Sequence, residues 1–360
     1  MSTLSDTAVR HALESYIDPV IGRSLVEADV LHAVSVRDGR AVVQIELGFP
    51  CKGYRAALEQ AVSSHLRSSL GVESTVQVTW VIQTHAVQAK LQPLPQIKNV
   101  IAVASGKGGV GKSTVAVNLA LALQAEGGRV GILDADIYGP SQPRMLGSTQ
   151  KPSSPDGKSM LPIEAHGLQA MSIGFLIDEE QPMIWRGPMA TQALMQLLNE
   201  THWRELDYLI VDLPPGTGDI QLTMSQRIPV SGALVVTTPQ DIALIDAKKG
   251  LQMFRRVEVP ILGLIENMSF YCCPNCGHRA DIFGSGGGER MSAQFGVDLL
   301  GRVPLDARIR EQADGGRPTV VAEPDSDLTM IYRDIARRAA ARLAHGDPET
   351  AFPEIQIADD

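Results

Sequence analysis

The 360-residue chain lacks the features that direct a protein to a membrane or to nucleic acid. It contains no apolar run long enough to cross a bilayer, and its first residues include no apolar core of a signal peptide. It also has no long block of Lys or Arg, and its formal net charge is −9. We therefore expect a cytoplasmic protein that binds neither nucleic acid nor a membrane.

Cysteine is scarce as well. The chain has four cysteines, and three of them fall within residues 272–276. This number is too small for a disulfide framework in a protein of this size. Clustered thiols in a reducing compartment indicate metal or redox chemistry instead.

The composition that remains is that of a soluble globular protein, with 44% hydrophobic and 20% charged residues. The length allows one large α/β domain and a smaller one. We expect the small α+β domain over residues 1–87 and a proline-containing linker over 88–98. In the small domain the pattern predicts a helix at 7–15, strands at 30–36 and 41–47, a helix at 54–70 and a strand at 76–81.

Residues 99–345 alternate between apolar, β-branched runs and helical spacing. This order predicts an α/β fold with a mostly parallel, doubly wound sheet covered by helices on both faces. Residues 346–360 are expected to form a tail. The predicted strands are 100–104, 130–133, 208–212, 233–237, 261–265 and 299–303.

A glycine-rich turn separates the first of these strands from the helix that follows. Its sequence, G-K-G-G-V-G-K-S over residues 106–113, matches the phosphate-binding loop of P-loop NTPases. Glycines let successive backbone N–H groups point at phosphate oxygens, and the helix adds its positive end. Lys112 is expected to reach the β- and γ-phosphates of ATP, and Ser113 to bind Mg²⁺. The residues expected to contact the nucleotide are Gly106, Lys107, Gly108, Gly109, Val110, Gly111, Lys112, Ser113 and Thr114.

Carboxylates end two later strands, where open α/β sheets bind their ligands. Asp134 and Asp136 follow one strand, and Asp212 ends another in the Walker B arrangement, where it would hold Mg²⁺ through water. We expect Asp134 to serve the outer shell of the metal. The alternative is that Asp134 and Asp136 only cap a turn.

The pair Cys273-x-x-Cys276 places two thiolates on one tight turn, which is typical of a metal site. A tetrahedral zinc site or an iron–sulfur cluster takes four ligands, and the sequence has no second C-x-x-C. Either Cys272 and His278 complete a local site, or a second copy of the chain supplies the other pair. Adjacent cysteines normally point apart, so we favour a two-fold homodimer. Structural zinc and a redox disulfide between Cys273 and Cys276 remain alternatives.

The motifs occur in the order of a known family. A second lysine, Lys107, stands in the phosphate loop, as in the deviant Walker A signature of the MinD/ParA class. D-A-D-I-Y-G-P-S over 134–141, D-L-P-P-G-T-G-D over 212–219, E-N-M-S over 266–269 and C-x-x-C over 273–276 follow in order. Over roughly residues 99–345 the chain resembles the Mrp/ApbC (NBP-type) iron–sulfur cluster carriers.

The resemblance implies a 4Fe–4S cluster that bridges two subunits and passes to apoproteins, with slow ATP hydrolysis. It implies catalytic roles for Lys107, Lys112 and Asp136. Lys107 would reach the nucleotide of the partner subunit, and Asp136 would activate the attacking water. Asn267 would bind the nucleotide base, with Asp306 on a loop near the same base.

Other interpretations stay open. Lys107 could be a solvated surface lysine, and Asn267 could simply form a turn. The whole chain could be a MinD/ParA-like positioning ATPase, a zinc-bridged dimeric ATPase or an electron donor like the nitrogenase iron protein. The N-terminal residues resemble the MIP18 (DUF59) domain, in which Cys51 would be either a transient cluster ligand or a buried thiol.

Overall fold

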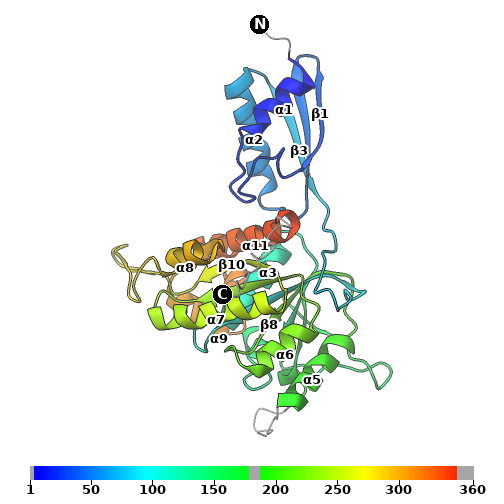
Figure 1. Ribbon diagram of the computed structural model, residues 1–360, viewed down its shortest axis with the longest axis vertical. Coiled ribbons are helices and arrows are strands. Elements are labelled where there is room, and N and C mark those ends of the chain that lie inside the picture. The colour runs from blue at the N-terminus through cyan, green and yellow to red at the C-terminus, as the bar shows by residue number, and fades with distance from the viewer. Residues whose placement is uncertain (1–3, 178–186, 347–360) are drawn as a thin grey trace, which may run out of the picture.

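The computed structural model describes residues 4–177 and 187–346 and contains two principal sheets (Figure 1). The N-terminal residues form a small α+β domain around a three-stranded sheet of order β1-β2-β3. The pair β1–β2 is antiparallel and the pair β2–β3 is parallel, as expected for a hairpin followed by a βαβ unit. Its elements are α1 (Asp6–Glu14), β1 (Leu31–Arg37), β2 (Arg40–Leu47), α2 (Arg55–Leu70) and β3 (Ser74–Trp80).

Local sequence explains how these elements begin and end. Asp38 and Gly39 both have positive φ, as a two-residue hairpin turn requires, and this short turn sets the pairing of β1 with β2. Helix α2 ends at Gly71, whose left-handed conformation closes the last turn through a hydrogen bond to the carbonyl of Arg67. The predicted elements are therefore present, with ends displaced by a residue or two.

The large sheet has eight strands in the order β13-β10-β9-β4-β8-β5-β7-β6. Every neighbouring pair is parallel except β6–β7. The prediction of a mostly parallel P-loop NTPase sheet is thus confirmed, while β6 and β7 were not predicted because they are short and lie beside a polar loop. The strands are β4 (Ile97–Ser105), β5 (Val130–Asp134), β6 (Ile163–Ala165), β7 (Leu168–Ser172), β8 (Leu206–Asp212), β9 (Gly232–Thr237), β10 (Ile261–Glu266) and β13 (Leu299–Arg302).

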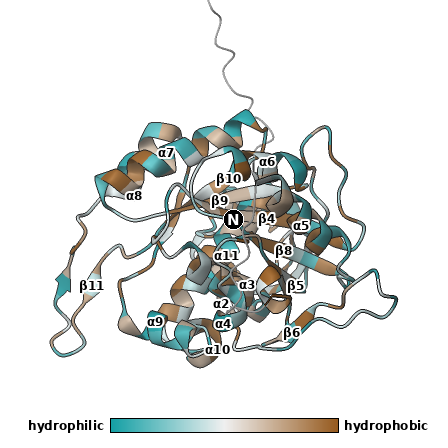
Figure 2. Ribbon diagram, turned by 90° about the horizontal axis from the view of Figure 1, so that it is seen from below, coloured by the Kyte–Doolittle hydropathy of each residue, from teal (hydrophilic) through white to brown (hydrophobic). Residues whose placement is uncertain are grey.

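Helices cover both faces of this sheet (Figure 2). Alternate residues of β4 enter two different cores: Ile101 and Val103 pack with α3 and α11, whereas Val100 and Ala102 pack with α5, α6 and α7. Successive side chains of a strand point to opposite faces of the sheet, so both faces are apolar and both are covered by helices, as in a doubly wound fold. The helices are α3 (Lys112–Ala125), α4 (Gln142–Met145), α5 (Gly187–Asn199), α6 (Asp219–Arg227), α7 (Asp241–Arg256), α8 (Gly287–Phe295), α9 (Ala307–Asp314), α10 (Thr319–Ala322) and α11 (Asp327–His345), with one 3₁₀ turn, η1 (Ile173–Phe175).

The small domain packs on α11 and on the C-terminal end of α3 (Figure 1). The boundaries 1–87, 88–98 and 99–345 remain a prediction, and the expected tail lies, from residue 347 on, outside the described residues. In the part of the chain that is described, no helix has both the length and the apolar character needed to cross a membrane.

Candidate functional site

The glycine-rich loop lies between β4 and α3, at the carboxyl edge of the large sheet. Gly109 and Gly111 both have φ near +80°, a conformation that glycine adopts without strain. A Cβ on Gly111 would lie 2.2 Å from Asn267 Nδ2, and one on Gly106 would lie 2.1 Å from the backbone of Asp246 in α7. Packing therefore favours glycine at 106, and positive φ favours it at 109 and 111, as in loops whose backbone N–H groups bind anions.

Lys112 and Ser113 begin α3 beside the Walker B carboxylate. The Lys112 ammonium forms an ion pair with Asp212 Oδ1 and lies 3.2 Å from Ser113 Oγ. Lys112 is 6% exposed and Asp212 is fully buried. The structure thus brings together the three residues that the sequence assigned to phosphate and Mg²⁺.

Gln142 is a fourth member of this group that the sequence analysis missed. Its Nε2 donates to Asp212 Oδ2 (2.9 Å) and to the carbonyl of Ser113 (3.1 Å). Its Oε1 and the hydroxyl of Ser141 are buried without a hydrogen-bond partner among the described residues. Oxygen acceptors beside Asp212 and Ser113 fit a hydrated Mg²⁺, which keeps several waters. No spacing rule identifies Gln142, since only the fold carries it to Asp212.

Asp134 organises the loop that follows β5. Its carboxylate accepts hydrogen bonds from the backbone N–H groups of Asp136 (3.1 Å), Ser141 (2.9 Å) and Gln142 (3.0 Å), and from Ser172 Oγ (3.1 Å). Burial, together with the nearby charge of Asp212, raises the pKa of Asp134 to about 7. These contacts are those of a turn cap, and the outer-shell metal role remains a prediction.

Asp136 is half-buried at the start of the same loop, where its Oδ1 accepts from the backbone N–H of Gly139 (3.3 Å). Burial raises its pKa, and the charge of Lys112 opposes that rise. Lys107 is partly exposed, and its ammonium contacts no acidic group within residues 4–177 and 187–346. Both a solvated Lys107 and one directed to a partner subunit fit this position.

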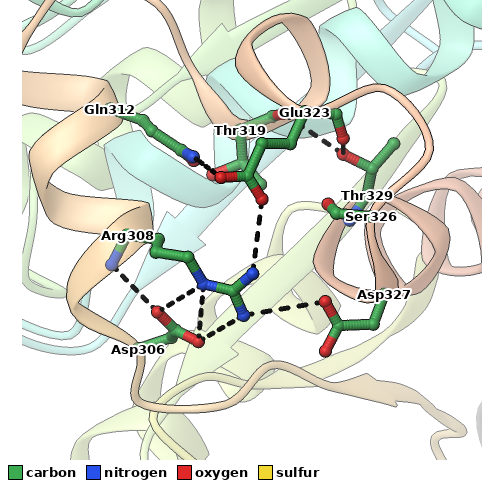
Figure 3. Close-up of polar contacts among 8 residues, drawn as sticks. All are labelled: Asp306, Arg308, Gln312, Thr319, Glu323, Ser326, Asp327 and Thr329. Carbon is green, nitrogen blue, oxygen red and sulfur yellow. Dashed lines mark hydrogen bonds and ion pairs between the residues drawn. The ribbon is translucent and has the colours of Figure 1, made fainter. Parts of the chain in front are cut away.

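The two residues expected near the nucleotide base have protein partners. Asn267 is buried, and its Nδ2 donates to the carbonyl of Val110 in the phosphate loop (2.8 Å). Asp306 caps α9 by accepting from the N–H of Arg308 (2.9 Å) and also binds the guanidinium of Arg308 (Figure 3). This guanidinium lowers the pKa of Asp306. Base binding by either residue remains a prediction.

Figure 3 shows that Arg308 ties Asp306 to the segment that leads into α11. Its guanidinium also contacts Glu323 (3.3 Å) and Asp327 (3.6 Å). Asp306 therefore helps to hold α9 against the start of α11, which is a structural role that its sequence position did not indicate.

The cysteine pair lies on a small hairpin of β11 (Tyr271–Cys272) and β12 (Arg279–Ala280), which extends from the body beside α8 (Figure 2). The backbone N–H of Cys273 donates to the carbonyl of His278, and that of Gly277 donates to the carbonyl of Cys273 (both 2.9 Å). The N–H groups of Asn275 and Cys276 face the Cys273 sulfur and lower the pKa of its thiol. This turn favours a thiolate, which is the form that binds metal.

All three thiols of the hairpin are free, and those of Cys272 and Cys276 are exposed. Cys272 is directed to the carbonyl of Gly277, with its sulfur 3.6 Å from that oxygen. Among the described residues no group of three or more His, Cys, Asp or Glu side chains is placed to hold a metal ion. The local site completed by Cys272 and His278 is therefore not formed in this structure.

Comparison with known proteins covers both domains. Residues 96–340 match the family model of NUBPL iron-transfer P-loop NTPases, and residues 6–80 match that of iron–sulfur cluster assembly proteins. The chain is 51% identical over 340 residues to an iron–sulfur cluster carrier protein of Escherichia coli K12, covering 93% of this chain and 91% of the relative. It is 50% identical over 256 residues to the mouse iron–sulfur cluster transfer protein NUBPL, covering 71% of this chain and 80% of the relative.

A solved structure shows the same fold. It is the nucleotide-binding protein of Archaeoglobus fulgidus in complex with ADP, with cobalt detected. Its sequence is 36% identical, and the match has a TM-score of 0.56 and covers 65% of this chain and 91% of the other.

Proposed function

Because the chain belongs to the family of NUBPL iron-transfer P-loop NTPases, we propose that it is an ATP-dependent carrier that binds an iron–sulfur cluster and transfers it to apoproteins. One observation carries this proposal. The chain combines a complete phosphate loop with a projecting hairpin on which Cys273 and Cys276 are free, and among the described residues no group of three or more possible ligands is placed to hold a metal ion.

The cargo we propose is a 4Fe–4S cluster held by four thiolates, with Cys273 and Cys276 supplied by each of two identical subunits. An isologous dimer brings the same hairpin of both copies together, so one C-x-x-C per chain suffices. The same dimer would let Lys107 of one subunit reach the nucleotide of the other. The thiolate character of Cys273 supports the assignment, since deprotonated sulfur is the ligand of both iron and zinc.

The proposed ATPase activity uses residues at the carboxyl edge of the large sheet. The loop N–H groups and Lys112 would bind the phosphates, and Ser113 and Asp212 would hold Mg²⁺, which would neutralise charge on the transferred group. Lys112 must leave Asp212 when phosphate arrives. Asp136, with a pKa raised by burial, is suited to orient the attacking water and accept its proton. We expect slow hydrolysis that serves cluster transfer in the cytoplasm.

The test is anaerobic reconstitution of the full chain with iron and sulfide, followed by metal and sulfide analysis and measurement of the molar mass. We expect a brown dimer that loses its visible absorbance to an apo-acceptor protein. Cys273→Ser and Cys276→Ser should each abolish cluster binding, because each removes two of the four ligands from the dimer. Both variants should retain ATP hydrolysis, since the phosphate site is built elsewhere.

Cys272→Ser is the matched control, because it removes the neighbouring thiol of the same hairpin and should leave cluster binding intact. A cluster on a monomer would contradict the proposal. Zinc bound in place of iron by the reconstituted protein would favour the zinc-bridged ATPase instead.

A further inference from the structure

The hairpin that carries the cysteines is attached to the sheet through one buried carboxylate. Glu266 is the last residue of β10 and is fully buried. Its Oε1 accepts from the hydroxyl of Ser269 (2.5 Å), and its Oε2 accepts from the backbone N–H of Gly288 (2.6 Å). Ser269 precedes the hairpin and Gly288 follows it. A single side chain thus holds both ends of the segment that bears Cys273 and Cys276.

The next residue, Asn267, holds the phosphate loop. Its Nδ2 donates to the carbonyl of Val110 and lies so close to Gly111 that the loop has no space for a Cβ there. The backbone N–H of Asn267 donates to the carbonyl of Thr237 in β9 (2.8 Å), which anchors this residue to the sheet. Two adjacent residues therefore contact the nucleotide loop on one side and the cysteine segment on the other.

The surroundings of Glu266 fix its position. Gly288 lies in the first turn of α8, where the positive end of the helix favours a carboxylate. The guanidinium of Arg302 lies 3.9 Å from Glu266 Oε1, and Arg302 also forms an ion pair with Glu289. Glu266 packs closely on Gly288, since a Cβ there would lie 3.0 Å from Glu266 Oε2. A buried side chain whose two oxygens are both hydrogen-bonded in this way is held in one geometry.

We propose that Glu266 and Asn267 form a rigid joint through which the nucleotide state of the phosphate loop changes the position of the cysteine hairpin. Both are positioning residues. When phosphate orders the loop around Val110 and Gly111, Asn267 shifts with it, and Glu266 transmits the shift to Ser269 and Gly288. This inference rests on the proposed function, because it assigns the route by which ATP would act on the cluster ligands.

The experiment measures thiol labelling of the reduced full chain without iron, in a Cys272→Ser background. The reactive thiols are then Cys273 and Cys276, because Cys51 is buried. Labelling by a small maleimide is timed with and without a saturating non-hydrolysable ATP analogue and Mg²⁺, and the Kd for the analogue is measured for each variant. We expect the analogue to change the labelling rate by about fivefold or more, as a coupling between two sites commonly does.

Glu266→Ala should abolish this nucleotide effect on labelling, because it removes the acceptors of both Ser269 and Gly288 and releases both ends of the segment. Glu311→Ala, which removes an exposed carboxylate of α9 that pairs with Arg310, is the matched control and should retain the effect, since Glu311 lies outside the contacts of Glu266. Ser269→Ala, a milder change that removes one bond, should reduce the effect and covers the case in which Glu266→Ala fails to fold.

A nucleotide effect that survives in folded Glu266→Ala overturns the joint. The joint is also overturned if the Cys272→Ser protein without a further substitution binds the analogue and its labelling rate does not change. Neither result touches the proposed function, because cluster loading is measured separately by iron and sulfide content.

Discussion

At the scale of single residues, the buried ion pair of Lys112 with Asp212 gives a proposed catalytic group a structural role as well. Both side chains are buried, and Gln142 supplies the second hydrogen bond that Asp212 needs. Breaking a buried pair from one side leaves an uncompensated charge, which costs far more than removal of both partners. In the proposed function Lys112 leaves Asp212 to bind ATP, so the contact that stabilises the nucleotide-free protein would oppose phosphate binding.

We expect Lys112→Ala to lose ATP hydrolysis and to lower the free energy of unfolding of the nucleotide-free protein by about 3 kcal/mol. The double variant Lys112→Ala/Asp212→Asn should recover much of that stability without recovering hydrolysis, because the buried charge is gone. Denaturant unfolding and a phosphate-release assay give the two quantities. Equal stability of the single and double variants would mean that the pair is not coupled in solution.

At the scale of elements, the phosphate loop is shaped by the helix and strand ends around it. Gly106 is pressed against the backbone of α7, and Gly111 against the side chain of Asn267 at the end of β10. The D-x-D loop after β5 is held by Asp134. The phosphate loop thus takes its conformation from neighbours far away in the sequence, whereas the D-x-D loop is held by a residue of its own segment.

Two alanine substitutions separate backbone strain from packing in this loop. Gly109→Ala meets only the strain of positive φ, because nothing lies within 4 Å of its Cβ position, whereas Gly111→Ala also collides with Asn267. The strain common to both is about 1–3 kcal/mol. We expect Gly111→Ala to be less stable and to bind ATP more weakly than its control Gly109→Ala, as measured by thermal unfolding and calorimetry. Equal behaviour of the two variants would exclude a role for the contact with Asn267.

At the scale of the whole molecule, the two domains meet at a buried carboxylate, Glu126, the residue that caps the C-terminal end of α3. Glu126 accepts from the backbone N–H of Gly53 in the small domain (2.8 Å) and pairs with Arg333 (2.8 Å) and Arg337 (3.4 Å) of α11. A negative charge at a helix C-terminus is unfavourable by itself, so these partners are needed. Cys51 lies near Glu126, and burial raises the pKa of the Cys51 thiol to about 12.

Glu126→Ala should loosen the small domain and expose Cys51. The substitution leaves two arginines and a backbone N–H without their acceptor, a loss on the scale of about 3 kcal/mol. We expect Cys51 to be alkylated faster in Glu126→Ala than in the unmodified protein. Mass spectrometry of the peptide that contains Cys51 measures the rate. Glu73→Ala, which removes an exposed pair with Arg67 inside the small domain, is the control. An unreactive Cys51 in the Glu126 variant would show that other contacts hold the domains together.

The sequence by itself determined the fold class, the two domains in outline, the phosphate loop and the cysteine turn. These depend on local signals: β-branched runs, helical spacing, glycines between a strand and a helix, and two thiols three residues apart. The tertiary structure alone decided which side chains meet. Gln142 and Glu126 carry no motif and act through partners distant in the chain, and the E-N-M-S motif that contains Glu266 did not indicate its contact with Gly288. The sequence likewise did not indicate that Asp306 meets Arg308 or that Cys272 is directed to the carbonyl of Gly277, since the geometry of a polar contact is set by the fold around it.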